Sequence, residues 1–130
     1  AVRREGADIS VITYGAMVHV ALEAAGTLAA EGIDLEIVAL RTLVPLDEDA
    51  VLESVKKTGK VILLHEDTRT GGLAGELAAR ISEKVFEHLD GPIVRITAPD
   101  CPVPYSPRLE EAFLPKAADV VEKARELHRY

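Results

Sequence analysis

Four short runs of apolar residues constrain the fold of this chain more than any other feature. They are almost continuously apolar rather than alternating, and they cover Ile9–Tyr14, Leu35–Leu40, Val61–Leu64 and Ile93–Thr97. Strands of this composition are usually buried on both faces, as in parallel sheets that helices cover on two sides. The runs therefore predict the central sheet of a three-layer α/β/α domain.

Segments with helical periodicity separate the four runs. Ala16–Ala30 has apolar residues at spacings of three and four, and Asp47–Lys57 begins with a capping aspartate and stops before Gly59. A third helix has apolar residues at every fourth position: Leu73, Leu77, Ile81, Val85 and Leu89. Strand–helix–strand repetition of this kind predicts right-handed βαβ units.

The two ends of the chain are expected to complete one domain over residues 1–130. Ala1–Arg4 suits a short edge strand, because its arginines would be exposed there. Ala98–Pro107 holds four prolines, so we expect a stiff, extended surface segment. Ser106 and Pro107 then begin a short helix, and a final helix follows over Lys116–Arg129.

Composition excludes several classes of protein. The net charge of −7 argues against a binder that follows nucleic-acid phosphates, and no apolar run approaches the length of a membrane span. Cys101, the single cysteine, excludes an internal disulfide and suggests a reducing compartment. The chain starts without methionine and without a signal-peptide pattern, so we expect a fragment or mature product that lacks a partner domain.

A ligand crevice is expected where two strands end in polar residues and glycines. If the strand order reverses between the first and third runs, their loops flank one crevice, and helix N-termini there could bind an anion or a nucleotide. The candidate residues are Tyr14, Gly15, His65, Glu66, Asp67, Gly71 and Gly72.

These residues do not form a complete catalytic set. His65 could act as a general base oriented by Glu66 or Asp67, or it could simply bond a loop carbonyl. One histidine beside two adjacent acids provides too few ligands, at the wrong spacing, for a structural zinc site. Glu66 and Asp67 alone would make a poor Mg²⁺ or Ca²⁺ site, because adjacent side chains on a strand point to opposite faces. The double glycine lacks the lysine of a phosphate-binding loop. We therefore assign no catalytic, cofactor-binding or metal residue.

Several phrases, in order, resemble one family across nearly the whole chain. The most specific are LRTLVPLD (40–47), KTGKVILLHE (57–66) and the D-x-P-x-PY run at 100–105, supported by GADISVITYGAMVHVALEAA (6–25) and GGLAGELAARI (71–81). They resemble the C-terminal, transketolase-type domain of the beta subunit of the thiamine-diphosphate-dependent decarboxylating component of 2-oxo acid dehydrogenases. The phrases do not indicate whether the oxo acid is pyruvate, a branched-chain acid or acetoin.

The resemblance implies a fold, and it assigns cofactor binding to a different part of the enzyme. The fold is a mixed five-stranded sheet of order 1-3-2-4-5 whose first strand, here Ala1–Arg4, is antiparallel. Thiamine diphosphate and Mg²⁺ are held in this family by a pyrimidine-binding domain, which would precede Ala1, together with the alpha subunit. The domain present here is therefore expected to be inactive by itself and to bind neither.

The resemblance also implies partners. The family's C-terminal domain packs against the alpha subunit and a second beta subunit in a heterotetramer, and it docks the basic peripheral-subunit-binding domain of the dihydrolipoyl acyltransferase. Asp90, where some members have a longer glutamate, and Tyr130 match docking positions, and the acidic net charge suits a basic partner. His65, Glu66 and Asp67 become subunit-facing residues. The expected location is the cytoplasm of a prokaryote or the mitochondrial matrix.

Two alternatives stay open at this point. The chain could be the C-terminal domain of another transketolase-group enzyme, such as transketolase or deoxyxylulose-phosphate synthase. It could also be an independent module that binds a small anion or nucleotide between Gly15 and Gly72.

Overall fold

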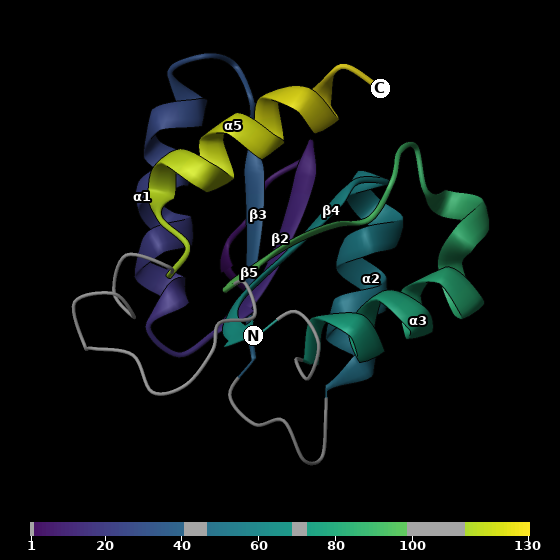
Figure 1. Cartoon of the computed structure of the whole chain (residues 1–130). Coiled ribbons are helices and arrows are strands. Elements are labelled where there is room, and N and C mark those ends of the chain that lie inside the picture. The colour runs from purple at the N-terminus through teal and green to yellow at the C-terminus, as the bar shows by residue number, and fades with distance from the viewer. Residues whose placement is uncertain (1, 41–46, 69–72, 99–113) are drawn as a thin grey trace, which may run out of the picture.

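A computed structural model describes residues 2–40, 47–68, 73–98 and 114–130 (Figure 1). Five strands form one sheet of order β1-β3-β2-β4-β5: β1 Val2–Arg4, β2 Ile9–Tyr14, β3 Leu35–Leu40, β4 Val61–Thr68 and β5 Val94–Ala98. Strand β1 is antiparallel to β3, and the other pairings are parallel. The predicted fold class, strand order and antiparallel first strand are confirmed.

Helices cover both faces of the sheet, as Figure 1 shows. Helices α1 (Met17–Ala29) and α5 (Ala117–His128) pack together on one face, and α2 (Glu48–Thr58) and α3 (Leu73–Val85) pack on the other. Each face has its own apolar core: Ile9, Val11 and Leu28 are buried on the α1/α5 side, and Ile12, Val55 and Leu77 on the α2/α3 side. The nearly continuous apolar runs are explained by this burial on both faces.

Local signals fix the ends of α2 as predicted. The Asp47 carboxylate accepts a hydrogen bond from the Ala50 main-chain N–H at 3.2 Å. At the other end Gly59 adopts φ +75°, a left-handed conformation that strains residues with a Cβ. Acidic residues occupy the first turn and lysines the last, which favours the helix dipole at both ends.

Two elements differ from the sequence-based expectation. Strand β4 continues from the apolar run through Thr68, so His65, Glu66 and Asp67 lie in a strand rather than in a loop. Helix α3 ends at Val85 and a short 3₁₀ turn, η1 (Phe86–His88), follows, so the predicted helical stripe stops before Leu89. The proposed helix at Ser106 and nearly all of the proline-rich segment lie outside the described residues.

No helix in the described part of the chain is long and apolar enough to cross a membrane.

Candidate functional site

The carboxyl ends of β2 and β4 lie side by side, as expected from the reversal of strand order. Strand β2 sits between β3 and β4 and pairs with both in parallel. Tyr14, the last residue of β2, meets His65 of β4 edge to face, with ring centroids 4.9 Å apart and planes at 81°. The structure therefore brings together the two segments that the sequence placed on either side of one crevice.

His65 is a core residue of this region. Its side chain is 0% exposed and contacts the Tyr14 ring. A buried imidazole cannot meet a substrate in solution, so the geometry does not support the general-base role.

Glu66 is exposed and lies beside Gly15. Gly15 has φ +61°, and a Cβ built on it would lie 3.7 Å from Glu66 Oε1. Gly15 lies two residues before Met17, the first residue of α1, and the N-terminus of a helix favours an anion. The Glu66 carboxylate already places a negative charge there, which disfavours a second anion.

The structure describes less of the other predicted crevice residues. The main chain of Asp67 belongs to β4, whereas Gly71 and Gly72 lie outside the described residues. In the described ranges, no group of three or more His, Cys, Asp or Glu side chains is arranged to hold a metal ion.

A second cluster, which we name the Tyr130 corner, lies at the opposite end of β4. It consists of Gly59, Lys60, Asp90, Gly91 and Tyr130. The Lys60 ammonium donates to the main-chain oxygens of Tyr130 at 2.8 Å and of His128 at 3.3 Å. These bonds attach the end of α5 to the residue that precedes β4.

Two glycines let the chain segments of the Tyr130 corner approach closely. The Asp90 N–H donates to the Gly59 carbonyl at 2.7 Å, and the Asp90 carboxylate lies where a Cβ on Gly59 would be. A Cβ on Gly91 would come within 3.3 Å of the Tyr130 Cβ and Cγ. Asp90 and Tyr130, which the family resemblance picked out, therefore share one corner, and both are exposed.

The predicted interface residues thus fall into two groups. His65–Asp67 lie toward the carboxyl end of β4, and the Tyr130 corner lies just before its amino end. Six residues separate Lys60 from Glu66, a span of about 20 Å at the usual rise of a strand. The two groups of predicted interface residues therefore lie at opposite ends of β4.

Sequence reasoning missed a buried polar network between the sheet and α2. Glu36 of β3 is 3% exposed and accepts from Ser54 Oγ at 2.6 Å and from Lys57 Nζ at 2.7 Å. Burial alone would raise the pKa of Glu36, but the hydrogen bonds from Lys57 and Ser54 outweigh it and hold that pKa below its ordinary value. The signal was present in the sequence as one acid inside an apolar run. We assign the network a structural role.

Residues 1–120 match the family model of the transketolase C-terminal domain. The chain belongs to this family. Its sheet order and its antiparallel first strand are those that the resemblance implied.

The curated relatives of this transketolase C-terminal domain include three beta subunits. It is 48% identical over 122 residues to the acetoin:2,6-dichlorophenolindophenol oxidoreductase subunit beta of Cupriavidus necator, covering 94% of the chain and 36% of the relative. It is 48% identical over 130 residues to the 2-oxoisovalerate dehydrogenase subunit beta of Bacillus subtilis, covering 99% and 40%. The Bacillus subtilis pyruvate dehydrogenase E1 component subunit beta is 44% identical, with coverage of 97% and 38%.

Two solved structures resemble this transketolase C-terminal domain. A split-gene transketolase, described as an inactive beta4 tetramer, has a TM-score of 0.84 and 32% identity, and the match covers 99% of the chain and 41% of that structure. A 2-oxoglutarate:ferredoxin oxidoreductase from Magnetococcus marinus has a TM-score of 0.66 at 20% identity, covering 98% and 20%, and shows the fold alone.

These matches confirm the resemblance to beta subunits of 2-oxo acid dehydrogenases. The transketolase C-terminal domain described here spans about two fifths of the length of those relatives. Their names cover pyruvate, 2-oxoisovalerate and acetoin, so they do not select a substrate.

Proposed function

We propose that this chain is the assembly domain of the beta subunit of a 2-oxo acid dehydrogenase decarboxylating component. Its role would be to pack against other subunits and to dock the acyltransferase. The observation that carries the proposal is the Tyr130 corner, because it places Asp90 and Tyr130 on one exposed surface in a chain about 48% identical to such beta subunits. The oxidative decarboxylation itself would belong to the whole enzyme.

An exposed carboxylate and an exposed aromatic ring at the Tyr130 corner support the docking of a basic partner. Asp90 and the 69%-exposed Tyr130 offer a carboxylate beside an exposed aromatic ring. An aromatic anchor with an adjacent charge is a common centre of a protein interface. Hydrogen bonds to Gly59 and from Lys60 fix the main chain of both residues before the partner arrives, which lowers the entropic cost of binding.

Thiamine diphosphate and Mg²⁺ do not fit the described residues at the carboxyl ends of the strands. Glu66 puts a carboxylate next to Gly15, at the helix start that would otherwise favour a diphosphate. His65 is buried beneath Tyr14. The proposal therefore assigns the cofactor to another part of the full enzyme, together with the alpha subunit.

The two alternatives from the sequence are less well supported. An anion- or nucleotide-binding module at Gly15 is disfavoured by the nearby Glu66 carboxylate. The C-terminal domain of a transketolase is consistent with the similarity to the split-gene enzyme at 32% identity. However, the identity to the acetoin and 2-oxoisovalerate beta subunits is higher, at 48%.

Two calorimetric titrations test the proposal. Titrating the chain with the peripheral-subunit-binding domain of its cognate dihydrolipoyl acyltransferase should give saturable heat that weakens as salt increases. Titrating it with thiamine diphosphate and Mg²⁺ should give none. Micromolar binding of thiamine diphosphate, with no response to the binding domain, would reverse the proposed division of roles.

A further inference from the structure

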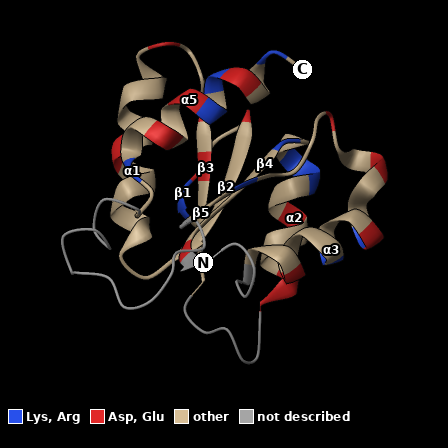
Figure 2. Ribbon diagram, viewed as in Figure 1, with Lys and Arg blue, Asp and Glu red and all other residues tan. Residues whose placement is uncertain are grey.

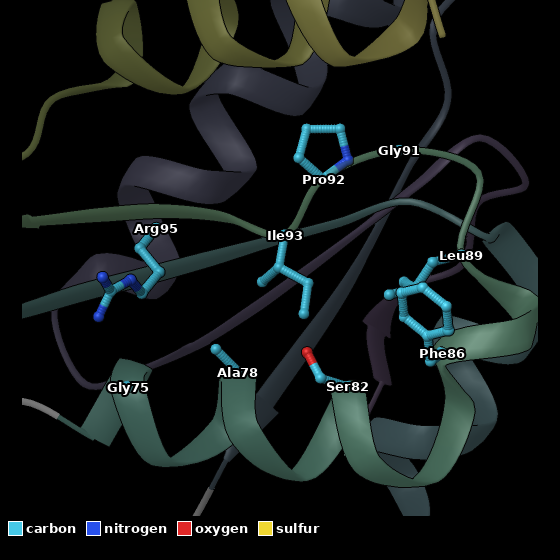
Figure 3. A pocket seen from close by; sticks show the side chains of 9 residues that line it. All are labelled: Gly75, Ala78, Ser82, Phe86, Leu89, Gly91, Pro92, Ile93 and Arg95. Carbon is cyan, nitrogen blue, oxygen red and sulfur yellow. The ribbon is translucent and has the colours of Figure 1, made fainter.

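An open groove, which we name the α3 groove, lies between α3 and the segment that leads into β5. Its volume of about 630 Å³ falls in the range of sites that hold small molecules. Figure 3 shows Ala78 and Ser82 of α3 on one side, Ile93 pointing toward them from the other, and Phe86 and Leu89 at one end. The α3 residues that line the groove are small, which leaves room for a ligand.

One end of the α3 groove is apolar. Ile93 and Leu89 pack against the α2/α3 core with part of each side chain still accessible, and the Phe86 ring beside them is 72% exposed. A hydrocarbon chain lying along these side chains would remove apolar surface of both partners from water, which favours binding. This end of the groove therefore suits the apolar part of a ligand.

The other end of the α3 groove holds a cation. Arg95 of β5 reaches toward α3, and its Nη1 would lie 3.5 Å from a Cβ on Gly75. Within the described part of the chain, Arg95 forms no hydrogen bond or ion pair. Lys84 of α3 differs, because it pairs with Glu48 at 2.8 Å. A guanidinium can donate two parallel hydrogen bonds to one carboxylate, so this end of the groove suits an organic acid.

The charges around the groove give a ligand one orientation. Glu87, next to Phe86, is 85% exposed and has a 4.0 Å contact to His88, and Asp90 is exposed as well. Figure 2 shows acidic residues at the end of α3 and on the turn η1 that follows it. An anion is repelled by these acids and attracted by Arg95. A carboxylate would therefore lie at the Arg95 end, and its apolar chain would point toward Phe86.

We propose that the α3 groove binds a medium-chain monocarboxylate, with its carboxylate on Arg95 and its hydrocarbon chain between Ile93 and α3. The length of the groove sets the length of the chain. Seven residues of α3 separate Gly75 from Ser82, a distance of about 10 Å, and an extended acid of about eight carbons has this length. The proposal goes beyond the assembly role and does not depend on it, because it involves neither another subunit nor the acyltransferase.

An NMR titration of the ¹⁵N-labelled 130-residue chain with octanoate at neutral pH tests the proposal. The amide signals of the residues that line the groove should shift and reach saturation. Small ligands gain little binding energy per atom, so we expect a dissociation constant on the order of a millimolar. Octanol, which has a similar chain and no charge, serves as a second probe of the apolar end.

Replacing Arg95 tests the recognition of the carboxylate. Arg95→Gln should weaken the binding of octanoate at least fivefold, because it removes the charge and the paired donors, and it should leave the affinity for octanol unchanged. Arg3→Gln makes the same charge change in β1, at the opposite edge of the sheet, and should leave the affinity for octanoate unchanged.

Filling the groove tests the position of the hydrocarbon chain. Ala78→Phe should abolish saturable binding of both probes, because the added ring would occupy the space between α3 and Ile93. Ala79→Phe is the matched control, since Ala79 is the next residue of α3, is exposed and does not line the groove. Circular dichroism verifies that both variants are folded, and Arg95→Gln decides the question if Ala78→Phe is not.

Three outcomes would overturn the proposal. The first is a native chain whose groove signals do not shift at about 10 mM octanoate. The second is an affinity for octanoate that Arg95→Gln leaves unchanged, and the third is saturable binding that persists in a folded Ala78→Phe variant.

Discussion

The Lys60 ammonium lies 2.8 Å from the main-chain oxygen of Tyr130, 70 residues further along the chain. It also reaches the oxygen of His128, so one side chain holds the last turn of α5 against the start of β4. The carbonyls at a helix C-terminus have no partner within the helix, and a lysine there satisfies them and favours the dipole. This contact sets the position of Tyr130 beside Gly91 and Asp90.

Replacing Lys60 should loosen the end of α5 more than it destabilises the domain. In Lys60→Met the amide protons of residues 128–130 should exchange several-fold faster, because exposed hydrogen bonds contribute little to global stability. The midpoint of urea unfolding should change little. Lys56→Met is a matched control, since its ammonium makes only a 3.8 Å pair with Glu53. Equal exchange at residues 128–130 in both variants would contradict the role of Lys60.

Gly59→Ala should destabilise the domain through two separate effects. Gly59 has φ +75°, and a Cβ there would collide with the Asp90 carboxylate. Gly32→Ala provides the control, because Gly32 has φ +80° with no atom near the built Cβ. The control should lose about 1 kcal/mol from backbone strain alone, and Gly59→Ala should lose more.

The difference in the loss of unfolding free energy between Gly59→Ala and Gly32→Ala measures the cost of displacing the Asp90 carboxylate. Chemical denaturation of both proteins measures it. Asp90→Ala in the Gly59→Ala background should recover part of the difference, because it removes the colliding carboxylate. Equal losses at the two glycines would show that Asp90 can move away freely.

The buried Glu36 should make stability depend on acid pH. Its folded-state pKa lies below the ordinary 4.5, so its contribution is fully present above that value and is lost as pH falls through the lowered pKa. Glu36→Gln should cost about 1–2 kcal/mol at neutral pH, because it weakens the bonds to Ser54 and Lys57. The variant should also lose less stability than the native chain between neutral pH and pH 3.

Urea unfolding at several pH values measures the effect of Glu36. Glu53→Gln is the control, because its carboxylate is exposed and its nearest cation is 3.8 Å away. That variant should follow the native pH profile. A Glu36→Gln profile parallel to the native one would show that the network does not lower the pKa of Glu36.

The fold could be predicted well from the sequence because a strand that is buried on both faces is a nearly continuous apolar run. Each apolar run became a strand, and Asp47 and Gly59 ended α2 where expected. The extension of β4 through Thr68 was missed because its charged residues read as a loop. Its cause is non-local: Thr68 pairs with Ala98 of β5. The end of α3 was missed for a similar reason, since Leu89 packs into the α2/α3 core after the helix has stopped.

The site was less predictable because its contacts join distant segments. Tyr14 and His65 could be placed together from strand order alone, but the burial of His65 could not. Asp90 and Tyr130 came from the family resemblance, whereas the roles of Gly59, Lys60 and Gly91 around them required the structure.

Charge reversal at Asp90 tests the docking role of the Tyr130 corner most directly. Asp90→Lys should weaken binding of the acyltransferase's peripheral-subunit-binding domain by about tenfold or more and should reduce its salt dependence. Glu23→Lys makes the same charge change on the exposed face of α1 and should leave the affinity nearly unchanged. Calorimetric titration compares the two variants with the native chain. An affinity that Asp90→Lys leaves unchanged, or that both variants weaken equally, would contradict docking at this corner.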